Sequence, residues 1–225
     1  MSMPEPRQHF HDELASLESA VGDMGERAER AIGNALQALA TGDERLADQV
    51  ILDDHPIDDR YLDVERRVLD LLARQTPVAS DLRLVSAILH INLHLERVGD
   101  MAVNIAKITN VTRNLPRSDS ILAALGEMGD VVRPMLRTSM EAFSRRDLDL
   151  ARRLPSMDDP VDRLNRGMYR EVAACAGDQD LLEWAVHMMV VSRQLERVGD
   201  HAVDIAEQVA FLLTGEFQEF SDDDG

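Results

Sequence analysis

Apolar residues recur at intervals of three and four along most of the chain, a spacing that gathers them on one face of an α-helix. The first such segment ends near Thr41 and Gly42, where glycine suits a helix C-terminus. Its apolar face consists of Leu14, Leu17, Val21, Met24, Ala28, Ala31, Ala35 and Ala38. No segment shows a convincing strand pattern, so the sequence predicts an all-α protein.

Two further helices are predicted in the first half of the chain. Residues 43–74 form one helix that Pro56 bends or divides in two, because proline removes a backbone hydrogen-bond donor. Thr76 and Pro77 supply an N-cap and a first-turn proline for the next helix, which continues to about residue 113. The residues that follow, 115–120, are then a linker.

The rest of the chain repeats this order. A fourth helix spans about residues 120–145, and a fifth begins near Asp147. The pentapeptide Glu-Arg-Val-Gly-Asp occurs in both halves, as residues 96–100 and 196–200. These copies are 100 positions apart, whereas Asp43 aligns with Asp147 at an offset of 104. A tandem duplication that lost four residues between its middle and last helices explains both offsets.

We therefore expect two tandem, structurally similar three-helix bundles. The first covers residues 8–116 and the second covers residues 117–215. Residues 216–225 are acidic and are expected to form a disordered tail.

Charge and composition restrict the partners and the location. The chain has 225 residues, with 42 acidic and 24 basic side chains and a net charge of -18, which disfavours binding to nucleic acid or to an anionic membrane. Cys175 is the only cysteine, so an intrachain disulfide and a thiolate metal site are excluded, and a cytoplasmic location is expected. The apolar stretches are too short to span a bilayer. Membrane association is therefore expected only through partners.

Pairs of carboxylates four residues apart mark the last and middle helices of each half. Such a pair lies on one side of a helix, about one turn apart, and the pairs at Glu96 and Glu196 lie away from the apolar face. Carboxylate oxygens are hard ligands that suit Mg²⁺, Mn²⁺, Ca²⁺ or oxidised iron, and Zn²⁺ also accepts them. The pattern predicts one metal site per half. The expected ligands are Asp54, Asp58, Glu96 and Asp100 in the first half and Asp158, Asp162, Glu196 and Asp200 in the second.

The alternative is that these carboxylates are simply solvated on an acidic helical surface, beside neighbours such as Arg97 and Arg197. The repeat argues against it, because core packing alone would preserve only the apolar residues of the pentapeptide. Gly99 and Gly199 support a special role, since glycine within a helix is destabilising by about 1 kcal/mol relative to alanine. Their presence predicts a close approach, either by a neighbouring helix or by a metal cluster.

Histidines are left out of these ligand sets. His201 follows Asp200, and adjacent residues on a helix point about 100° apart, so His201 is expected at the surface or at an interface. No histidine has a glutamate three residues before it, which disfavours a carboxylate-bridged di-iron enzyme. A phosphate-binding glycine loop, a nucleophile elbow and an HExxH motif are also absent. We expect no catalytic site.

The segments RQTPVASDLRLVSAILHINLHLERVGDMAVNIAK (74–107) and RQLERVGDHAVDIAE (193–207) resemble the PhoU family of phosphate-specific transport accessory proteins. The resemblance implies a fold of two similar three-helix bundles and a cytoplasmic negative regulator of the phosphate-starvation response. The implied partners are a phosphate ABC transporter, through its ATPase, and a sensor histidine kinase, and a homodimer is also implied. Pro56 falls inside the first acidic pair of the middle helices, which departs from the commonest family pattern.

The resemblance also implies metal binding. In the family, acid-xxx-acid motifs bind iron or zinc clusters in some members and magnesium or manganese in others. Carried over to this chain, the motifs give the same eight carboxylates as the spacing. Two other functions stay open: a metal-independent helical adaptor and, less favoured, the di-iron enzyme.

Overall fold

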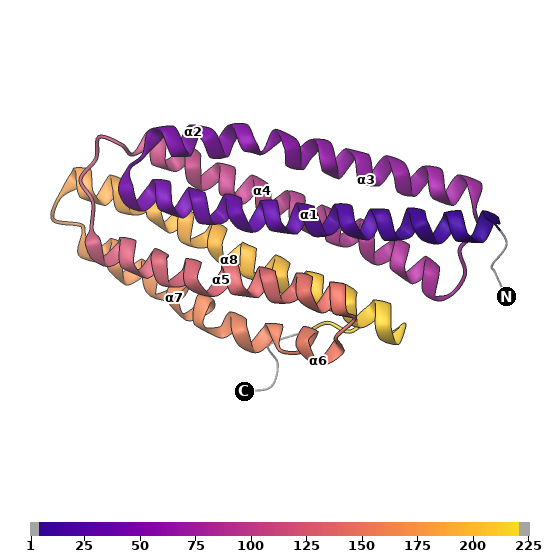
Figure 1. Cartoon of the computed structure of the whole chain (residues 1–225). Coiled ribbons are helices and arrows are strands. Elements are labelled where there is room, and N and C mark those ends of the chain that lie inside the picture. The colour runs from indigo at the N-terminus through magenta and orange to yellow at the C-terminus, as the bar shows by residue number, and fades with distance from the viewer. Residues whose placement is uncertain (1–4, 221–225) are drawn as a thin grey trace.

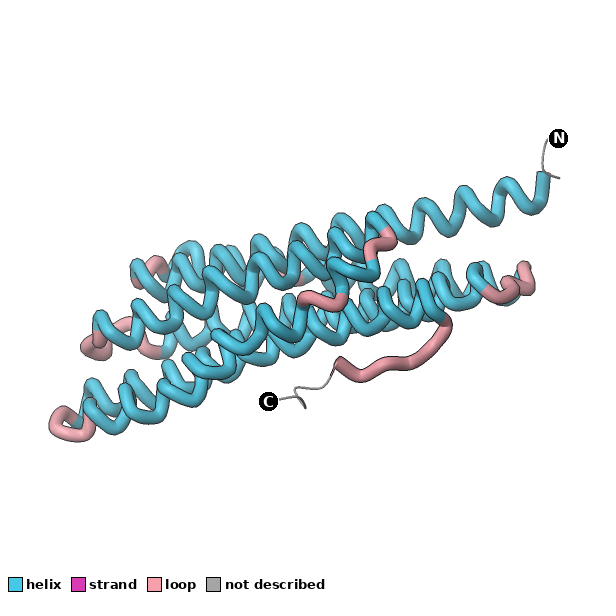
Figure 2. The backbone as a smooth tube through the Cα atoms, turned by 90° about the horizontal axis from the view of Figure 1, so that it is seen from below, coloured by secondary structure: helices cyan, strands magenta, loops and turns pink. Residues whose placement is uncertain are grey.

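The computed structural model describes residues 5–220, with side chains from residue 8 onward, and α-helices account for most of this range (Figure 1). No strand occurs between residues 5 and 220, and only short loops join the helices (Figure 2). The first half contains α1 (Glu5–Thr41), α2 (Glu44–Asp53), α3 (His55–Arg74) and α4 (Ser80–Val111). The second half contains α5 (Asp119–Arg145), α6 (Leu148–Ala151), α7 (Leu154–Ala174) and α8 (Gln179–Thr214). The all-α prediction is confirmed.

Each half is a three-helix bundle whose middle rod is divided into two helices. In the first half α2 and α3 follow one another along the bundle, and in the second half α6 and α7 do so (Figure 1). The two bundles lie one above the other in that view. Helix α4 packs against α8 and α1 packs against α5, so the halves share an extended interface. The prediction of two similar three-helix bundles is confirmed.

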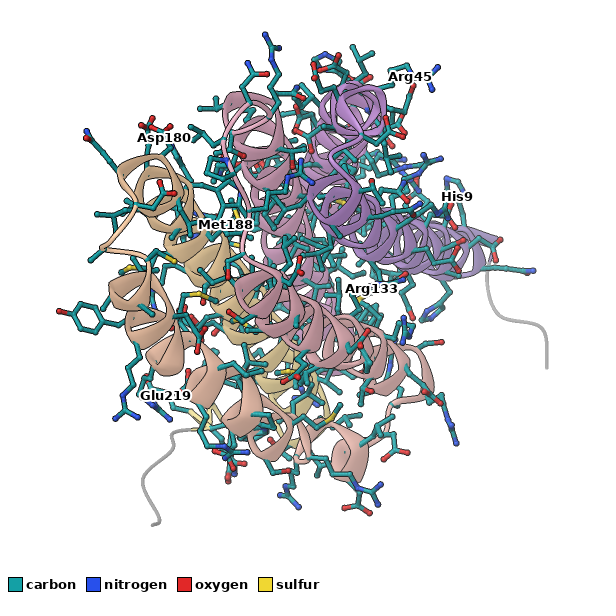
Figure 3. The ribbon with its side chains drawn as sticks, turned by 90° about the vertical axis from the view of Figure 1, so that its left-hand side faces the viewer. His9, Arg45, Arg133, Asp180, Met188 and Glu219 are labelled. Carbon is teal, nitrogen blue, oxygen red and sulfur yellow. The ribbon has the colours of Figure 1, made fainter. Side chains whose placement is uncertain are left out.

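The core follows the apolar faces that the sequence predicts. Along α4 the inward positions Ile88, Leu95 and Val98 have no solvent exposure, and along α8 the same holds for Met188 and Leu195. Figure 3 shows Met188 among the helices, whereas Arg45 and Asp180 point outward. Burial of each such side chain stabilises the fold by roughly 1.5–3 kcal/mol, and the buried apolar side chains together supply most of the free energy that holds the bundles together.

The middle rods break at different places. In the first half the break is at Asp54, and Pro56 occupies the first turn of α3, where its missing N–H has no helical partner to lose. In the second half the break is at Arg152 and Arg153, with Pro155 in the first turn of α7. Pro160, which aligns with Pro56, lies inside α7. The repeat therefore preserves the sequence alignment of the middle rods but not the position of the break.

Helix ends agree with the sequence except at the start of α4. Helix α1 ends at Thr41, followed by Gly42 with a positive φ of 71°, as predicted. Helix α4 begins at Ser80, so the prediction of Thr76 as its N-cap is wrong. The chain is extended at Gln75 and has a positive φ of 45° at Ala79. The connection uses these residues to reverse direction between α3 and the neighbouring α4 (Figure 1).

The C-terminal segment runs back along α8. The ring of Phe217 stacks on Phe211 with centroids 4.0 Å apart. The backbone N–H of Phe220 donates a hydrogen bond to Glu207 Oε1 at 2.6 Å. Disorder of the tail stays a prediction, and residues 221–225, which belong to it, lie outside the described residues.

Across the described range, no helix combines the length and the apolar composition that crossing a bilayer requires.

Candidate functional site

The structure brings the four predicted carboxylates of the first half together, and we call Asp54, Asp58, Glu96 and Asp100 the first acidic site. Asp54 lies at the junction of α2 and α3, and Asp58 lies in the first turn of α3. Glu96 and Asp100 come from α4, which packs against both helices. A Cβ atom added to Gly99 would lie only 2.8 Å from Asp54 Oδ1. The glycine therefore leaves room for a carboxylate of the neighbouring helix.

Mutual repulsion within the first acidic site is visible in its pKa values. Partial burial, followed by the negative charges of Asp58, Asp100 and Glu96, raises the pKa of Asp54 from 3.8 to about 6. Burial and the charges of Asp100 and Asp58 also raise the pKa of Glu96. Within the described part of the chain, no arginine or lysine forms an ion pair with any of the four. Arg97 lowers the pKa of Glu96 through its charge but makes no ion pair with it, so the site concentrates negative charge that the protein balances only in part.

The second acidic site consists of Asp158, Asp162, Glu196 and Asp200 and has the same plan. A Cβ atom at Gly199 would overlap Asp158 Oδ1, so this glycine also makes room for a carboxylate of the middle rod. Burial, then the charge of Asp200, raises the pKa of Glu196, and Asp162 adds to the effect. Burial likewise raises the pKa of Asp200.

Glu196 differs from its counterpart because it is buried, with 8% of its surface exposed. Glu196 was predicted to lie away from the apolar face, which is wrong in that this side chain is buried, whereas Asp100 and Asp200 are exposed. Helix α8 packs against α4, α5, α6 and α7. Glu196 Oε1 accepts a hydrogen bond from Arg193, whereas Glu196 Oε2 has no hydrogen-bond partner within the part of the chain that the structure describes.

Arginines partly balance the second acidic site. Besides the contact between Arg193 and Glu196, Arg166 donates to Asp162 Oδ2 at 3.0 Å. A groove of about 230 Å³ leads to this site from solvent. The groove is lined by Pro155, Asp158, Asp200, Val203, Asp204, Glu207 and Phe220.

Both acidic sites fit a divalent cation by the chemistry of their donors. Each offers four carboxylate groups from two rods, the hard oxygen ligands that Mg²⁺ and Mn²⁺ prefer and that iron and zinc also accept. In the first site a cation would offset the burial and the repulsion that together raise the pKa of Asp54. In the second site it would satisfy the buried, unpaired Glu196 Oε2.

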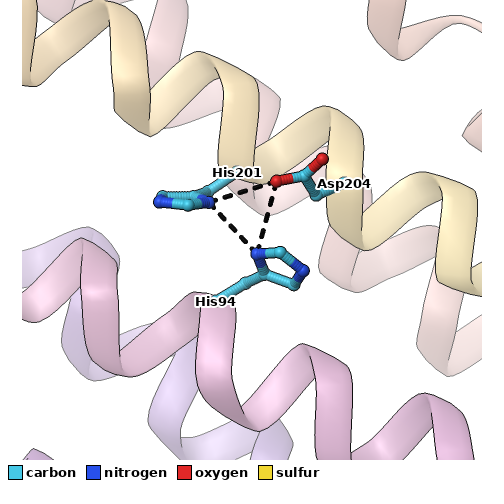
Figure 4. Close-up of side chains that lie close together, drawn as sticks. All are labelled: His94, His201 and Asp204. Carbon is cyan, nitrogen blue, oxygen red and sulfur yellow. Dashed lines mark hydrogen bonds and ion pairs between the residues drawn. The ribbon is translucent and has the colours of Figure 1, made fainter.

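Sequence reasoning missed a third cluster, at the contact between α4 and α8. His94 Nδ1 lies 3.1 Å from His201 Nδ1, and Asp204 Oδ2 lies 3.4 Å and 3.2 Å from these two nitrogens (Figure 4). Burial lowers the pKa of His94 to about 4, so its imidazole is neutral near pH 7. His201 was expected at the surface or at an interface, and it lies at the interface between the two halves. No pattern within either half could have paired His94 with His201.

Another groove, of about 680 Å³, lies elsewhere, between α1 and α5. Glu29 on its wall accepts hydrogen bonds from Arg133 at 2.8 Å and from Arg137 at 2.6 Å. None of the eight predicted ligands lines this groove.

Comparison with known proteins shows the family. The PhoU domain matches twice, over residues 21–109 and 125–209. The phosphate-specific transport system accessory protein PhoU homologue of Caulobacter vibrioides is 35% identical over 208 residues, which are 92% of this chain and 90% of that protein. The homologue of Clostridium acetobutylicum is 33% identical over 218 residues, covering 96% of this chain and 99% of that protein.

Two solved structures have the same fold. The crystal structure of PhoU from Pseudomonas aeruginosa matches with a TM-score of 0.87 and 32% identity, over 92% of this chain and 100% of that one. The phosphate transport system regulatory protein PhoU from Streptococcus pneumoniae matches with a TM-score of 0.86 and 28% identity, over 94% of this chain and 100% of that one. The repeated bundles, the paired acidic motifs and these similarities together establish that the chain belongs to the PhoU family.

Proposed function

We propose that this protein is a cytoplasmic accessory protein of a phosphate transport system and a negative regulator of the phosphate-starvation response. It couples a phosphate ABC transporter to a sensor histidine kinase through a metal-binding helical scaffold. Relatives that cover nearly the whole chain are named phosphate-specific transport system accessory proteins, which supports the accessory role. The regulatory role draws on the Streptococcus pneumoniae relative, whose description is that of a regulatory protein.

The observation that carries the metal-binding part is the assembly of two acidic sites, each built from two separate rods. Gly99 and Gly199 are the structural signature of these sites, because each lets a carboxylate of the middle rod lie against the last helix. A solvated acidic surface needs no such glycine. A divalent cation bound in either acidic site would supply positive charge, and carboxylates of the middle rod and of the last helix of the same half would hold it.

Charge connects metal binding with partner binding. The apoprotein carries a net charge of -18, and each acidic site concentrates part of it. Once neutralised by a cation, these surfaces lose the repulsion that holds the carboxylates apart and present a fixed arrangement of helices. Basic or helical surfaces of the transporter ATPase and the kinase are the expected partners for these acidic faces.

The test uses a variant that keeps shape and removes charge, Glu96→Gln with Asp100→Asn. Metal content is measured on protein purified without added metal, together with capture of the transporter ATPase and the kinase and a phosphate-regulated reporter. We expect loss of the cation of the first half, weaker capture of the partners and a reporter that stays active in high phosphate. The matched control is Glu44→Gln with Asp48→Asn, an exposed pair with the same spacing on α2. An unchanged metal content, capture and reporter in the first variant would refute the proposal.

A metal-independent helical adaptor is the second candidate, and chelation separates it from the first. The adaptor predicts that chelated protein captures its partners as well as untreated protein does. The di-iron enzyme predicts oxygen consumption by iron-loaded protein, which we do not expect because no predicted ligand set contains a Glu-x-x-His motif. A homodimer is proposed from the family resemblance, and light scattering coupled to size-exclusion chromatography tests it.

A further inference from the structure

The cluster at the contact between the two halves has the composition of a metal site of its own. His94 comes from α4, whereas His201 and Asp204 come from α8, one turn apart on that helix. We call these three residues the His–His–Asp tripod. Figure 4 shows both rings and the carboxylate pointing toward one common position. Their three nearest ligand atoms lie within 4.8 Å of one another.

The spacing of the three atoms fits a metal ion. The sides of the triangle measure 3.1, 3.2 and 3.4 Å. Ligand atoms about 2.1 Å from a metal lie about 3.0 Å apart in octahedral geometry and about 3.4 Å apart in tetrahedral geometry. The observed sides fall between these two values, so a cation could contact all three atoms with little movement of the side chains.

Hydrogen bonds alone cannot satisfy this arrangement. Each Nδ1 carries either one proton or one lone pair in the ring plane, and an ionised carboxylate only accepts. If His201 donates to Asp204 while His94 is unprotonated at Nδ1, a lone pair of His94 faces the carboxylate oxygen. If both rings donate to Asp204, their two N–H groups face each other. A cation is attracted to all three lone pairs at once and removes the conflict.

Burial makes the arrangement costly unless a ligand is present. The His201 side chain is 9% exposed and that of His94 is 15% exposed. Among the described residues His201 Nε2 is buried and has no hydrogen-bond partner, and the polar contacts of the ring there are those of the tripod. Asp204 is 41% exposed and also lines the groove of the second acidic site, which provides an entry path and room for water ligands.

We propose that His94, His201 and Asp204 bind one divalent transition-metal ion, of the Zn²⁺, Fe²⁺ or Co²⁺ type, that joins the two halves of the molecule. Two imidazoles and one carboxylate select such ions over Mg²⁺ and Ca²⁺, which prefer oxygen donors. Each acidic site holds together the rods of one half, whereas the tripod holds α4 to α8. None of the three ligands is among the eight carboxylates of the acidic sites, so the tripod does not require the function proposed above, although Asp204 shares a groove with Asp158 and Asp200.

The experiment is a titration of metal-free protein with Co²⁺ in the presence of excess Mg²⁺, which competes with Co²⁺ at any site made of carboxylates alone. We expect one Co²⁺ per chain, with the visible absorption bands of Co²⁺ bound by imidazole ligands. Zn²⁺ should displace this Co²⁺, and Co²⁺ binding should raise the melting temperature of the protein. His94→Ala should remove the bands and lower the affinity for Co²⁺ at least about tenfold. His90→Ala is the matched control, because His90 lies one turn away on α4 and is exposed.

Two further variants keep the result interpretable. His94→Gln serves where the alanine variant is unstable, since glutamine occupies the equivalent position 194 of the second half. Glu96→Gln with Asp58→Asn removes charge from the first acidic site only and should leave the Co²⁺ bands intact. Equal Co²⁺ binding by the wild type and by both His94 variants would overturn the proposal. Loss of the bands in the acidic-site variant but not in the His94 variants would also overturn it.

Discussion

Replacing Asp54 with asparagine should make the metal-free protein more stable. The side chain is half-buried beside Asp58, Asp100 and Glu96, and its pKa rises from 3.8 to about 6. At about 1.4 kcal/mol per pKa unit, this rise sets an upper limit of about 3 kcal/mol on the destabilisation at neutral pH. Partial solvent exposure reduces the figure to about 1–2 kcal/mol. Asparagine keeps the shape and removes the charge. It also loses no helix cap, because the Asp54 side chain makes no capping hydrogen bond to α3.

The sign of the pH dependence follows from the same shift. The unfolded chain releases the Asp54 proton near its ordinary pKa of 3.8, whereas the folded chain releases it near 6. Between these values the folded state binds more protons, so the free energy of unfolding falls as the pH rises. The loss is complete above about pH 6, and the Asp54→Asn variant lacks this part of the pH dependence.

Urea unfolding of chelated protein at pH 7.5 and at pH 4.5 measures both effects. The variant should be more stable than the wild type by about 1–2 kcal/mol at pH 7.5, equivalent to about 2–8 °C in melting temperature for a chain of this size. At pH 4.5 the difference should shrink. Asp59→Asn in the neighbouring helix α3 is the control, since Asp59 is exposed.

Added metal should cancel most of the stability advantage of the variant. Mn²⁺ at 100 times its dissociation constant stabilises the wild type by about 2.7 kcal/mol, and a tenfold weaker site in the variant gains only about 1.4 kcal/mol. A variant that is less stable than the wild type without metal, or that gains as much from Mn²⁺, would refute the account of the first acidic site.

Three other substitutions test neighbouring parts of the structure. Gly99→Ala should lower the Mn²⁺ affinity of the first acidic site about tenfold by calorimetry, because the added Cβ lies 2.8 Å from Asp54 Oδ1, although alanine favours the helix by about 1 kcal/mol. Arg193→Ala should raise the Mn²⁺ affinity of the second acidic site, since the guanidinium competes with a cation for Glu196. Leu95→Ala should reduce the free energy of unfolding by about 2–5 kcal/mol in urea, because Leu95 is fully buried.

The helical periodicity of the apolar residues predicted most of the fold. The apolar faces of α4 and α8 are buried as predicted. Apolar residues at intervals of three and four over a long segment form one face of an α-helix, and that face is buried when it packs against other helices. The predicted start of α4 was wrong. Thr76 and Pro77 suit a helix start locally, but the chain needs the residues up to Ala79 to reverse its direction after α3. Local capping signals carry no information about the distance that a loop must cover.

The repeat predicted which carboxylates meet but not how deeply each is buried. Asp54 lies against Gly99, and Asp158 lies against Gly199. The offsets of 104 in the middle rods and 100 in the last helices therefore matched structurally equivalent positions. The burial of Glu196 depends on how neighbouring helices cover the flank of α8. That coverage is a property of the assembled bundle.

The repeat could not predict the tripod, because the tripod residues of one half have no equivalent in the other. The positions equivalent to His94, His201 and Asp204 are Gln194, Met101 and Asn104, a set with no imidazole and no carboxylate. A search for features present in both halves therefore passes over it. The angle between neighbouring residues on one helix separated His201 from Asp200 correctly, but it could not show that α4 brings His94 to the same place. A chain built by duplication has one surface where its two halves meet, and there a single substitution in either half can create a site that neither half contains alone.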